Sequence, residues 1–408
     1  MSNKNAMPVW DLCGSPRQLG LAQGELARQS YDSLLSTFFG SELWHMAKPF
    51  GVPNAVLKHY LAALGRFYTR PVLKKYMPAQ YERVRAIGEA LGAGGFTWAL
   101  AFIEVLFTEG GKSLQVPKGQ RPRFEPIPGL SGGADMLGCT QANATPRATA
   151  GQVPLMGRNY DFPRLLLDYQ VVRRDTPTDR KRFATTSLTQ TVLAGSHQGI
   201  NEKGLSISAN NSRPWLKHNY DRRGVPGLFL LQEALETCAT TVEAVTFISQ
   251  FPARASSNFF GIMDRTGHLA ELEFTPHAVR VREPDESGVL AASNHAHLNL
   301  EMNPPDNAVW VVPGMEGKSY MASCRARFGV ADRMLRAEAG AITVETMKSI
   351  LRDHSFSGGV GSEDTVCCHG HQGISLASAI IDLATRELHV TKGPPCQSEY
   401  QVVPFRQS

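Results

Sequence analysis

A cysteine that follows a glycine and precedes a hydroxyl residue is the feature of this chain best suited to chemistry. The motif is Gly138-Cys139-Thr140, and it follows a stretch, 109–137, that is rich in Gly, Pro, Lys and Arg and lacks periodicity. So long a segment without regular structure is unusual inside a compact domain and indicates a functional or mobile region. A thiol is a strong nucleophile at neutral pH once a base removes its proton. Cys139 is therefore a candidate nucleophile.

Two kinds of base could activate this thiol. A papain-like scheme needs a histidine with an orienting Asn or Asp, and His295 and His354 are the candidates. Alternatively, a cut between Gly138 and Cys139 would give the cysteine a free α-amine with a pKa of about 7.7–8.0, which could act as its own base. Glycine leaves the carbonyl before Cys139 accessible to the thiol. The competing interpretation is an ordinary buried cysteine at the start of a strand.

Three polar motifs downstream could complete an acyl-transfer site. They are "GRNYDF" at 157–162, "GINEKGLSISANN" at 199–211, and Asn294-His295 within "AASNHAHL". Such a site needs N–H donors for an oxyanion and a charged group that holds an amine. Asparagines at strand ends can supply the donors and an Arg/Asp pair can supply the charge, although each motif alone is more often structural.

In this order and spacing, the motifs resemble the choloylglycine hydrolase and penicillin V acylase branch of the N-terminal nucleophile hydrolases. "GSPRQLGLAQGE", "ILRDH" and the ending "LASAIIDLATRELHVTKGPPCQSEY" narrow the resemblance to the acyl-CoA:6-aminopenicillanic acid acyltransferase family, also called the C45 peptidases. Members are made as precursors that cleave themselves before the cysteine. The resemblance spans nearly the whole chain.

The resemblance implies a role for each of five residues. Cys139 would be the nucleophile for self-cleavage and then for substrate, with its freed α-amine as base. Asp161 would hold that amine, and Arg158 would help to keep the thiol ionised. The backbone N–H of Asn211 and the side chain of Asn294 would form the oxyanion hole.

Two points of the resemblance stay open. The acyltransferase has glutamine where this chain has Arg158, and in this respect the chain is more similar to the bile-salt and penicillin V hydrolases, which favours hydrolysis slightly. The family also places a late arginine near the nucleophile. Here "SCRARF" offers Arg325 and Arg327, and each could equally be a surface residue at a helix start.

The fold implied is α+β: a four-layer αββα sandwich with two antiparallel sheets, preceded by a mainly helical N-terminal segment. Residues 1–138 would become a smaller chain that stays associated with the catalytic chain, 139–408, as a heterodimer of the two fragments.

The periodicity of the sequence agrees with this architecture. Ser15 and Pro16 predict a helix start, and Leu19, Ala22, Leu26 and Ala27 then share one face. Three more helices are expected before 109, further helices within 228–251, and helices around 323–338 and 343–353. Short strands are expected from Cys139 onward, with hairpins at 259–274 and 376–395.

Composition excludes several other classes of protein. The net charge of +5 is small for 408 residues. The basic run from Arg173 to Arg182 contains aspartates and is interpreted as a solvated loop, so no nucleic acid partner is expected. No apolar run predicts a signal peptide or a membrane span. Seven scattered cysteines favour a reducing, cytoplasmic setting.

One cluster of possible metal ligands has the wrong spacing for a known motif. "CCHGH" contains Cys367, Cys368, His369 and His371, but it lacks the C-x₂-C spacing of a structural zinc site. Cys396 in "GPPC" recurs in the family without a role that the sequence explains. We expect no metal and no cofactor.

The sequence thus predicts a self-processing cysteine enzyme that acts on amides through a Cys139 thioester. It would be an amidohydrolase, or an N-acyltransferase from an amide or acyl-CoA to an amine, so its partners would be small molecules. The alternative is a binding protein that keeps the fold, or a zinc-stabilised module, and has lost processing.

Overall fold

The computed structural model describes residues 6–41, 44–45, 48, 51–108, 114–115, 138–213, 215–311, 315–370 and 373–405. Apart from 114–115, the irregular segment predicted at 109–137 lies outside these residues. In the described part, no helix is both long enough and apolar enough to cross a membrane.

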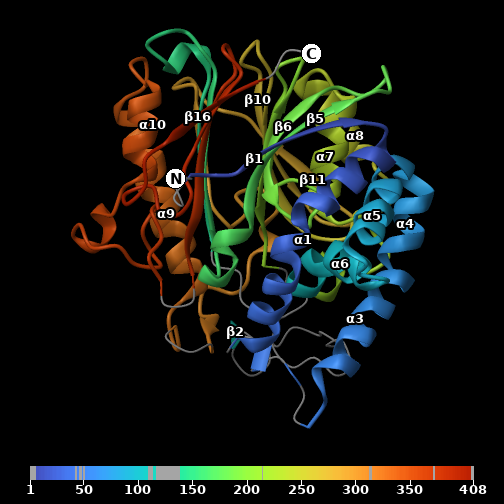
Figure 1. Ribbon diagram of the computed structural model, residues 1–408. Helices are drawn as coiled ribbons and strands as arrows, with labels where there is room; N and C mark the ends of the chain where they lie inside the picture. Colours follow the sequence, from blue (N-terminus) through green and yellow to red (C-terminus); the bar gives the residue numbers. More distant parts are fainter. Residues whose placement is uncertain are drawn as a thin grey trace.

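Two β-sheets lie face to face at the centre of the molecule (Figure 1). The larger sheet has the order β1-β5-β6-β7-β8-β9-β10-β11: Val9–Gly14, Gln170–Pro177, Thr185–Gln190, Gln198–Asn201, Ser206–Asn211, Asn258–Met263, Leu269–Phe274 and Val279–Arg282. The smaller has the order β12-β3-β4-β14-β15-β16: Val289–Ala292, Cys139–Ala144, Leu155–Phe162, Ile374–Asp382, Glu387–Val390 and Gln401–Pro404. Met156 and Ala377 of the smaller sheet share a buried cluster with Val172 and Leu188 of the larger. A separate pair joins β2, Leu114–Gln115, to β13, Val309–Trp310.

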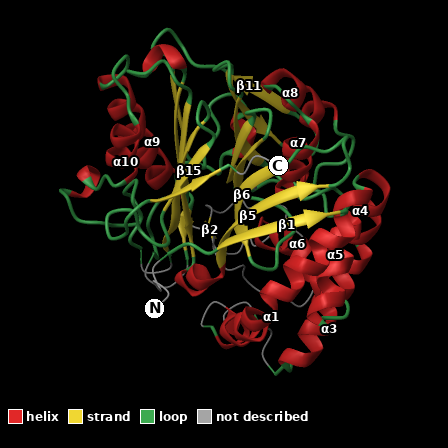
Figure 2. Cartoon of the chain, turned by 45° about the horizontal axis from the view of Figure 1, so that its top comes forward, coloured by secondary structure: helices red, strands yellow, loops and turns green. Residues whose placement is uncertain are grey.

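Helices cover the outer face of each sheet (Figures 1 and 2). The helices α7, Gly227–Thr237, and α8, Thr241–Gln250, pack on the larger sheet, and α9, Tyr320–Ala337, and α10, Val344–Leu351, pack on the smaller. This confirms the predicted αββα sandwich. One detail differs, because β1 pairs with β5 in parallel at the edge of an otherwise antiparallel sheet.

The predicted N-terminal helices are confirmed, and the structure adds one short helix, α4. They are α1, Pro16–Gly40, α3, Asn54–Phe67, α4, Thr69–Tyr76, α5, Pro78–Leu91, and α6, Phe96–Thr108. Ser15 caps α1 in a capping box with Gln18. The predicted apolar face of α1 is partly wrong, because Leu26 is 49% exposed. The contact with α5 uses Gly20 instead, where a Cβ would lie 2.4 Å from the Arg83 carbonyl oxygen.

The helices predicted within 228–251 are confirmed as α7 and α8, which are separated at 238–240, where Thr240 caps α8 by accepting from the Glu243 N–H. One other prediction is corrected. The basic run is not a solvated loop throughout: Arg173 lies in β5 and is fully buried. Its guanidinium bonds Asp175 of the same strand at 2.8 Å, so the aspartate that suggested a surface loop is a buried counter-ion.

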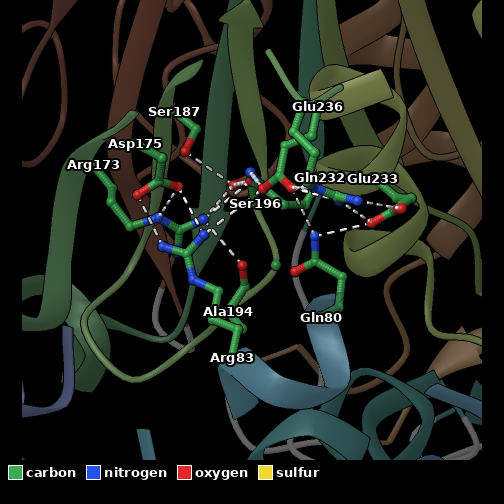
Figure 3. A network of polar contacts seen from close by, with 12 residues as sticks. Gln80, Arg83, Arg173, Asp175, Ser187, Ala194, Ser196, Gln232, Glu233 and Glu236 are labelled. Carbon is green, nitrogen blue, oxygen red and sulfur yellow. Dashed lines mark hydrogen bonds and ion pairs between the residues drawn. The ribbon is translucent and has the colours of Figure 1, made fainter. Parts of the chain in front are cut away.

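A buried polar network joins the N-terminal helices to the larger sheet (Figure 3). Arg83 of α5 forms a two-point ion pair with Asp175, both contacts at 2.9 Å. Burial alone would raise the pKa of Asp175, but Arg173 and Arg83 hold it below its usual value. Gln80 of α5 also donates to Glu233 and Glu236 of α7. Desolvated charges of this kind must stay paired, so the network fixes α5 against the sandwich.

A second buried contact joins α6 to the start of α7. Glu104 accepts from the N–H groups of Gly227 and Leu228 at 3.0 and 2.9 Å, and from the Ser256 hydroxyl at 2.6 Å. A carboxylate at this position satisfies free N–H groups of the helix start and matches the helix dipole. The N-terminal segment therefore supplies the cap of α7, a helix that packs on the larger sheet.

Replacing this cap should destabilise the protein strongly. In a Cys139→Ala background, which removes the thiol of the expected self-cleavage, Glu104→Ala is expected to lower the free energy of unfolding by about 2–4 kcal/mol, because buried donors lose their acceptor. Glu89→Ala removes only exposed ion pairs, with Arg17 and Arg85, and should cost less than about 1 kcal/mol. Urea denaturation followed by circular dichroism measures both, and equal effects would contradict the assigned role of Glu104.

Candidate functional site

Cys139 is the first residue of β3, which lies between β12 and β4 in the smaller sheet. It pairs with Tyr160 of β4 and is 5% exposed. It belongs to a buried apolar cluster that also contains side chains of the N-terminal helices α1, α3 and α6, among them Leu34, Leu57 and Phe96. The candidate nucleophile therefore lies between the sheet and the N-terminal segment.

Two buried arginines converge on Cys139 from different elements. Arg158 of β4 places Nη2 3.0 Å from the Cys139 sulfur, and Arg327 of α9 donates from Nη1 to the Cys139 carbonyl oxygen at 2.7 Å. Each is 2% exposed. Arg325, by contrast, is exposed and pairs with Asp306. The structure thus separates the two candidates that the sequence left open, because the orientation of α9 turns Arg327 inward.

Arg327 also explains the glycine before the nucleophile. A Cβ on Gly138 would lie 2.0 Å from Arg327 Nη2. The guanidinium cannot easily move away, because it is bonded to the Cys139 carbonyl, the Thr140 hydroxyl and Asn294 Oδ1. A residue with a side chain at position 138 would therefore displace a buried cation.

The predicted asparagines lie beside Cys139. The Cys139 N–H donates to Asn294 Oδ1 at 2.6 Å, and Asn294 Nδ2 donates to the Asn211 carbonyl oxygen at 2.8 Å. Asn210 was missed: its Nδ2 approaches the Cys139 carbonyl oxygen at 3.4 Å and its Oδ1 accepts from Arg158. The sequence shows two adjacent asparagines, and only the strand's alternation of faces could have pointed to the first. The oxyanion-hole roles of Asn211 and Asn294 stay predictions.

Asp161 lies beside the nucleophile and has spare hydrogen-bonding capacity. Its backbone N–H bonds the Cys139 sulfur, and its Oδ1 accepts from the Ser375 hydroxyl at 2.6 Å. Its Oδ2 is buried and has no hydrogen-bond partner within the described ranges. Burial raises the pKa of Asp161 to about 6, although Arg327, Ser375 and Arg158 oppose the rise. This carboxyl group can therefore take up and release a proton near neutral pH.

The thiol itself is harder to ionise than expected. Burial raises the pKa of Cys139, and the nearby Arg158 lowers it only in part. In the uncut chain, Arg158 alone therefore does not keep the sulfur ionised, and a base must take its proton.

The histidines of the papain-like alternative are engaged elsewhere. His295 Nδ1 is 2.7 Å from the Ser293 hydroxyl, and burial lowers the pKa of this imidazole to about 3. His354 packs edge-on against His369. Among the described residues, neither forms a hydrogen bond with Cys139. The geometry therefore favours a base other than histidine.

Comparison with known proteins gives one family and several distant structures. The family model of acyl-coenzyme A:6-aminopenicillanic acid acyl-transferase matches residues 148–352. A mutant of the conjugated bile acid hydrolase from Clostridium perfringens is 12% identical with a TM-score of 0.39, over 66% of this chain and 98% of that one. The N-acylethanolamine-hydrolyzing acid amidase ortholog of Caenorhabditis elegans gives 14% and 0.41, over 65% and 100%. Penicillin V acylase from Agrobacterium tumefaciens gives 15% and 0.37, over 62% and 82%. No curated protein sequence matches the chain.

The two arginines of α9 provide a matched test of the site. If the chain cuts itself before Cys139, Arg327→Met should slow the cut by about 10²–10³-fold, because the variant loses the buried cation that lies beside Gly138 and holds the Cys139 carbonyl. Arg325→Met should leave the rate unchanged, because Arg325 is exposed and pairs with Asp306 at the surface. Gel electrophoresis of samples taken over time measures both rates, and similar rates in both variants would contradict the assignment.

Proposed function

Because a family model covering half of its length matches, this chain belongs to the acyl-coenzyme A:6-aminopenicillanic acid acyl-transferase family, and we propose that it is a self-processing cysteine enzyme of amide chemistry. The observation that carries the proposal is the set of contacts around Cys139. The thiol, N–H and carbonyl of this residue are each held by a different buried polar side chain: Arg158, Asn294 and Arg327.

The first reaction is the cut that makes the enzyme. The Cys139 sulfur attacks the Gly138 carbonyl carbon while its proton passes to Asp161, whose free Oδ2 accepts it. The resulting oxyanion collapses, the bond from carbon to the Cys139 nitrogen breaks, and that nitrogen takes the proton. Residues 1–138 are then held as a thioester, which water hydrolyses. The buried Arg327 guanidinium holds the Cys139 carbonyl and lies beside Gly138, so it can stabilise the negative charge that develops on the Gly138 oxygen.

The second reaction uses the amine that the cut creates. A free α-amine has a pKa of about 7.7–8.0, so it can take the thiol proton and later give it to the leaving nitrogen of an amide substrate. Asp161 holds that amine, and Asn211 and Asn294 donate to the oxyanion. The acyl group remains on sulfur as a thioester until water or an amine accepts it. An acyl-CoA could load the same thioester.

The surroundings of the sulfur support an apolar acyl group. The cluster that contains Cys139 is built from aliphatic and aromatic side chains of both segments, including Leu100, Phe162 and Leu376. Donors with an aliphatic or aromatic acyl chain should therefore be used faster than acetyl donors. A panel of acyl-CoA thioesters and acyl amides of increasing chain length measures this, and a preference for acetyl would contradict it.

The two fragments should remain together after the cut. The contacts that join them do not involve the cut bond: they are the buried ion pair of Arg83 with Asp175 and the cap that Glu104 gives to α7. The proposed enzyme is accordingly a heterodimer of its own fragments.

Loss of the thiol should abolish turnover. Cys139→Ala is expected to lower turnover of the best acyl donor by ~10³-fold or more, as for other nucleophile deletions, and to leave no acyl adduct by mass spectrometry. Cys13→Ala, at an exposed cysteine of β1, should behave as wild type. Binding of the same donor without turnover in the wild type would instead favour a processing-deficient binding protein.

The rate of the cut should depend on pH through Asp161. Its pKa is raised from 3.8 to about 6, so the proton-accepting form, and with it the rate, should rise as pH increases through about 6. Linkage gives the opposite sign for stability: the contribution of Asp161 to folding is full below about pH 4 and is lost as pH rises through 6. Asp161→Asn should cut slowly without this rise. A rate that is flat from pH 5 to 7 in the wild type, measured after a pH jump, would contradict the role.

A further inference from the structure

Four side chains with metal-binding atoms meet near the start of β14, far from the Gly138–Cys139 peptide in the sequence. They are His354, after α10, Cys367 and His369, before β14, and Cys396, between β15 and β16. One ligand atom from each lies within 4.8 Å of all the others. Three separate segments of the chain therefore bring two sulfurs and two imidazoles to one point.

The distances around His369 lie near the short end of those expected between the ligand atoms of a tetrahedral ion. His369 Nε2 is 3.3 Å from the Cys367 sulfur and 3.1 Å from the Cys396 sulfur. A single ring nitrogen makes one hydrogen bond, so it cannot serve both thiols fully. Zinc holds sulfur at about 2.3 Å and nitrogen at about 2.0–2.1 Å, which puts tetrahedral ligand atoms about 3.3–3.8 Å apart. A cation between these atoms would satisfy all of them.

Two further observations point to this position. His354 Nε2 is buried, with no hydrogen-bond partner in the part of the chain that the structure describes. Gly361, in the glycine-rich stretch at 358–364, lies against the His369 ring, where a Cβ would be 2.4 Å from Cδ2. The backbone thus leaves room for the imidazole to reach the cluster.

We propose that His354, Cys367, His369 and Cys396 bind one Zn²⁺ ion. The two cysteines lose their thiol protons to solvent on binding, and the imidazoles bind as neutral rings. Four protein ligands fill a tetrahedral shell and leave no open position, so the site is structural. The proposal does not depend on the proposed acyl chemistry.

The bound ion would stiffen the support of Asp161. The Cys367 N–H bonds the Asp353 carbonyl at 3.1 Å, so the loop that carries it is already attached to the end of α10. The next residue, Cys368, donates from its N–H to the Ser375 hydroxyl at 3.0 Å, and that hydroxyl donates to Asp161. An ion bound to Cys367 would thus be connected to the Asp161 carboxylate through the next residue and two hydrogen bonds. Cys396 would join the C-terminal segment to the same ion.

The sequence pointed to a different ligand set. Of the "CCHGH" residues, only Cys367 and His369 join the cluster. The Cys368 sulfur lies near the Gly373 carbonyl, in an apolar cluster with Trp310 and Cys324, and His371 lies outside the described residues. The expectation that the chain binds no metal is the one that this proposal replaces.

The test is zinc binding by the reduced, full-length protein. Protein stripped with a chelator and incubated with Zn²⁺ should retain about one ion per chain after desalting, measured by elemental mass spectrometry. Co²⁺ should give the thiolate-to-metal and ligand-field bands of a tetrahedral sulfur–nitrogen site. Cys396→Ser changes an exposed residue and should lose most of the zinc, and His354→Ala should do the same.

Cys13→Ser, at an exposed cysteine outside the cluster, is the matched control and should keep the full amount. Circular dichroism shows whether each variant is folded. The proposal is overturned if the wild type retains no zinc, or if Cys396→Ser retains as much zinc as the control. It is also overturned if the purified protein has Cys367 and Cys396 joined as a disulfide, which peptide mapping without reduction would show.

Discussion

The structure depends on two buried guanidinium groups that converge on one residue, Cys139. Arg158 contacts the Cys139 sulfur and Arg327 contacts the Cys139 carbonyl, and each is 2% exposed. Removing a cation from water costs several kcal/mol unless opposite charge and hydrogen bonds offset it. Asp161 supplies opposite charge to both, and asparagine oxygens supply hydrogen bonds. This balance holds the site at the start of a central strand.

Several elements of the sandwich position the charged groups around Cys139. The strands β3 and β4 place the nucleophile beside Arg158 and Asp161, and α9 is oriented so that Arg327 reaches the Cys139 carbonyl. The N-terminal helices close the opposite side with apolar side chains and are themselves fixed by Glu104 and Arg83. A cut after Gly138 would therefore release a chain end without removing the contacts that build the fold.

The sequence predicted more of the layers than of the contacts. Local patterns were sufficient for the cap at Ser15 and for the alternation of helices and strands, because these depend on neighbouring residues. The burial of Arg173 was not predicted. Its partner Asp175 lies on the same strand, but its partner Gln232 lies on α7 and reaches it only in the folded protein. The choice of Arg327 over Arg325 depends on the orientation of α9, which no local spacing gives. The cluster of His354, Cys367, His369 and Cys396 was missed for a similar reason, because these residues come from three distant segments.

The most direct measurement is the intact mass of the purified full-length protein under denaturing conditions. The account predicts two chains, one that ends at Gly138 and one that begins at Cys139, and a single chain for Cys139→Ala. A wild-type chain that remains whole for days at neutral pH would contradict it, as would a cut that persists in Cys139→Ala.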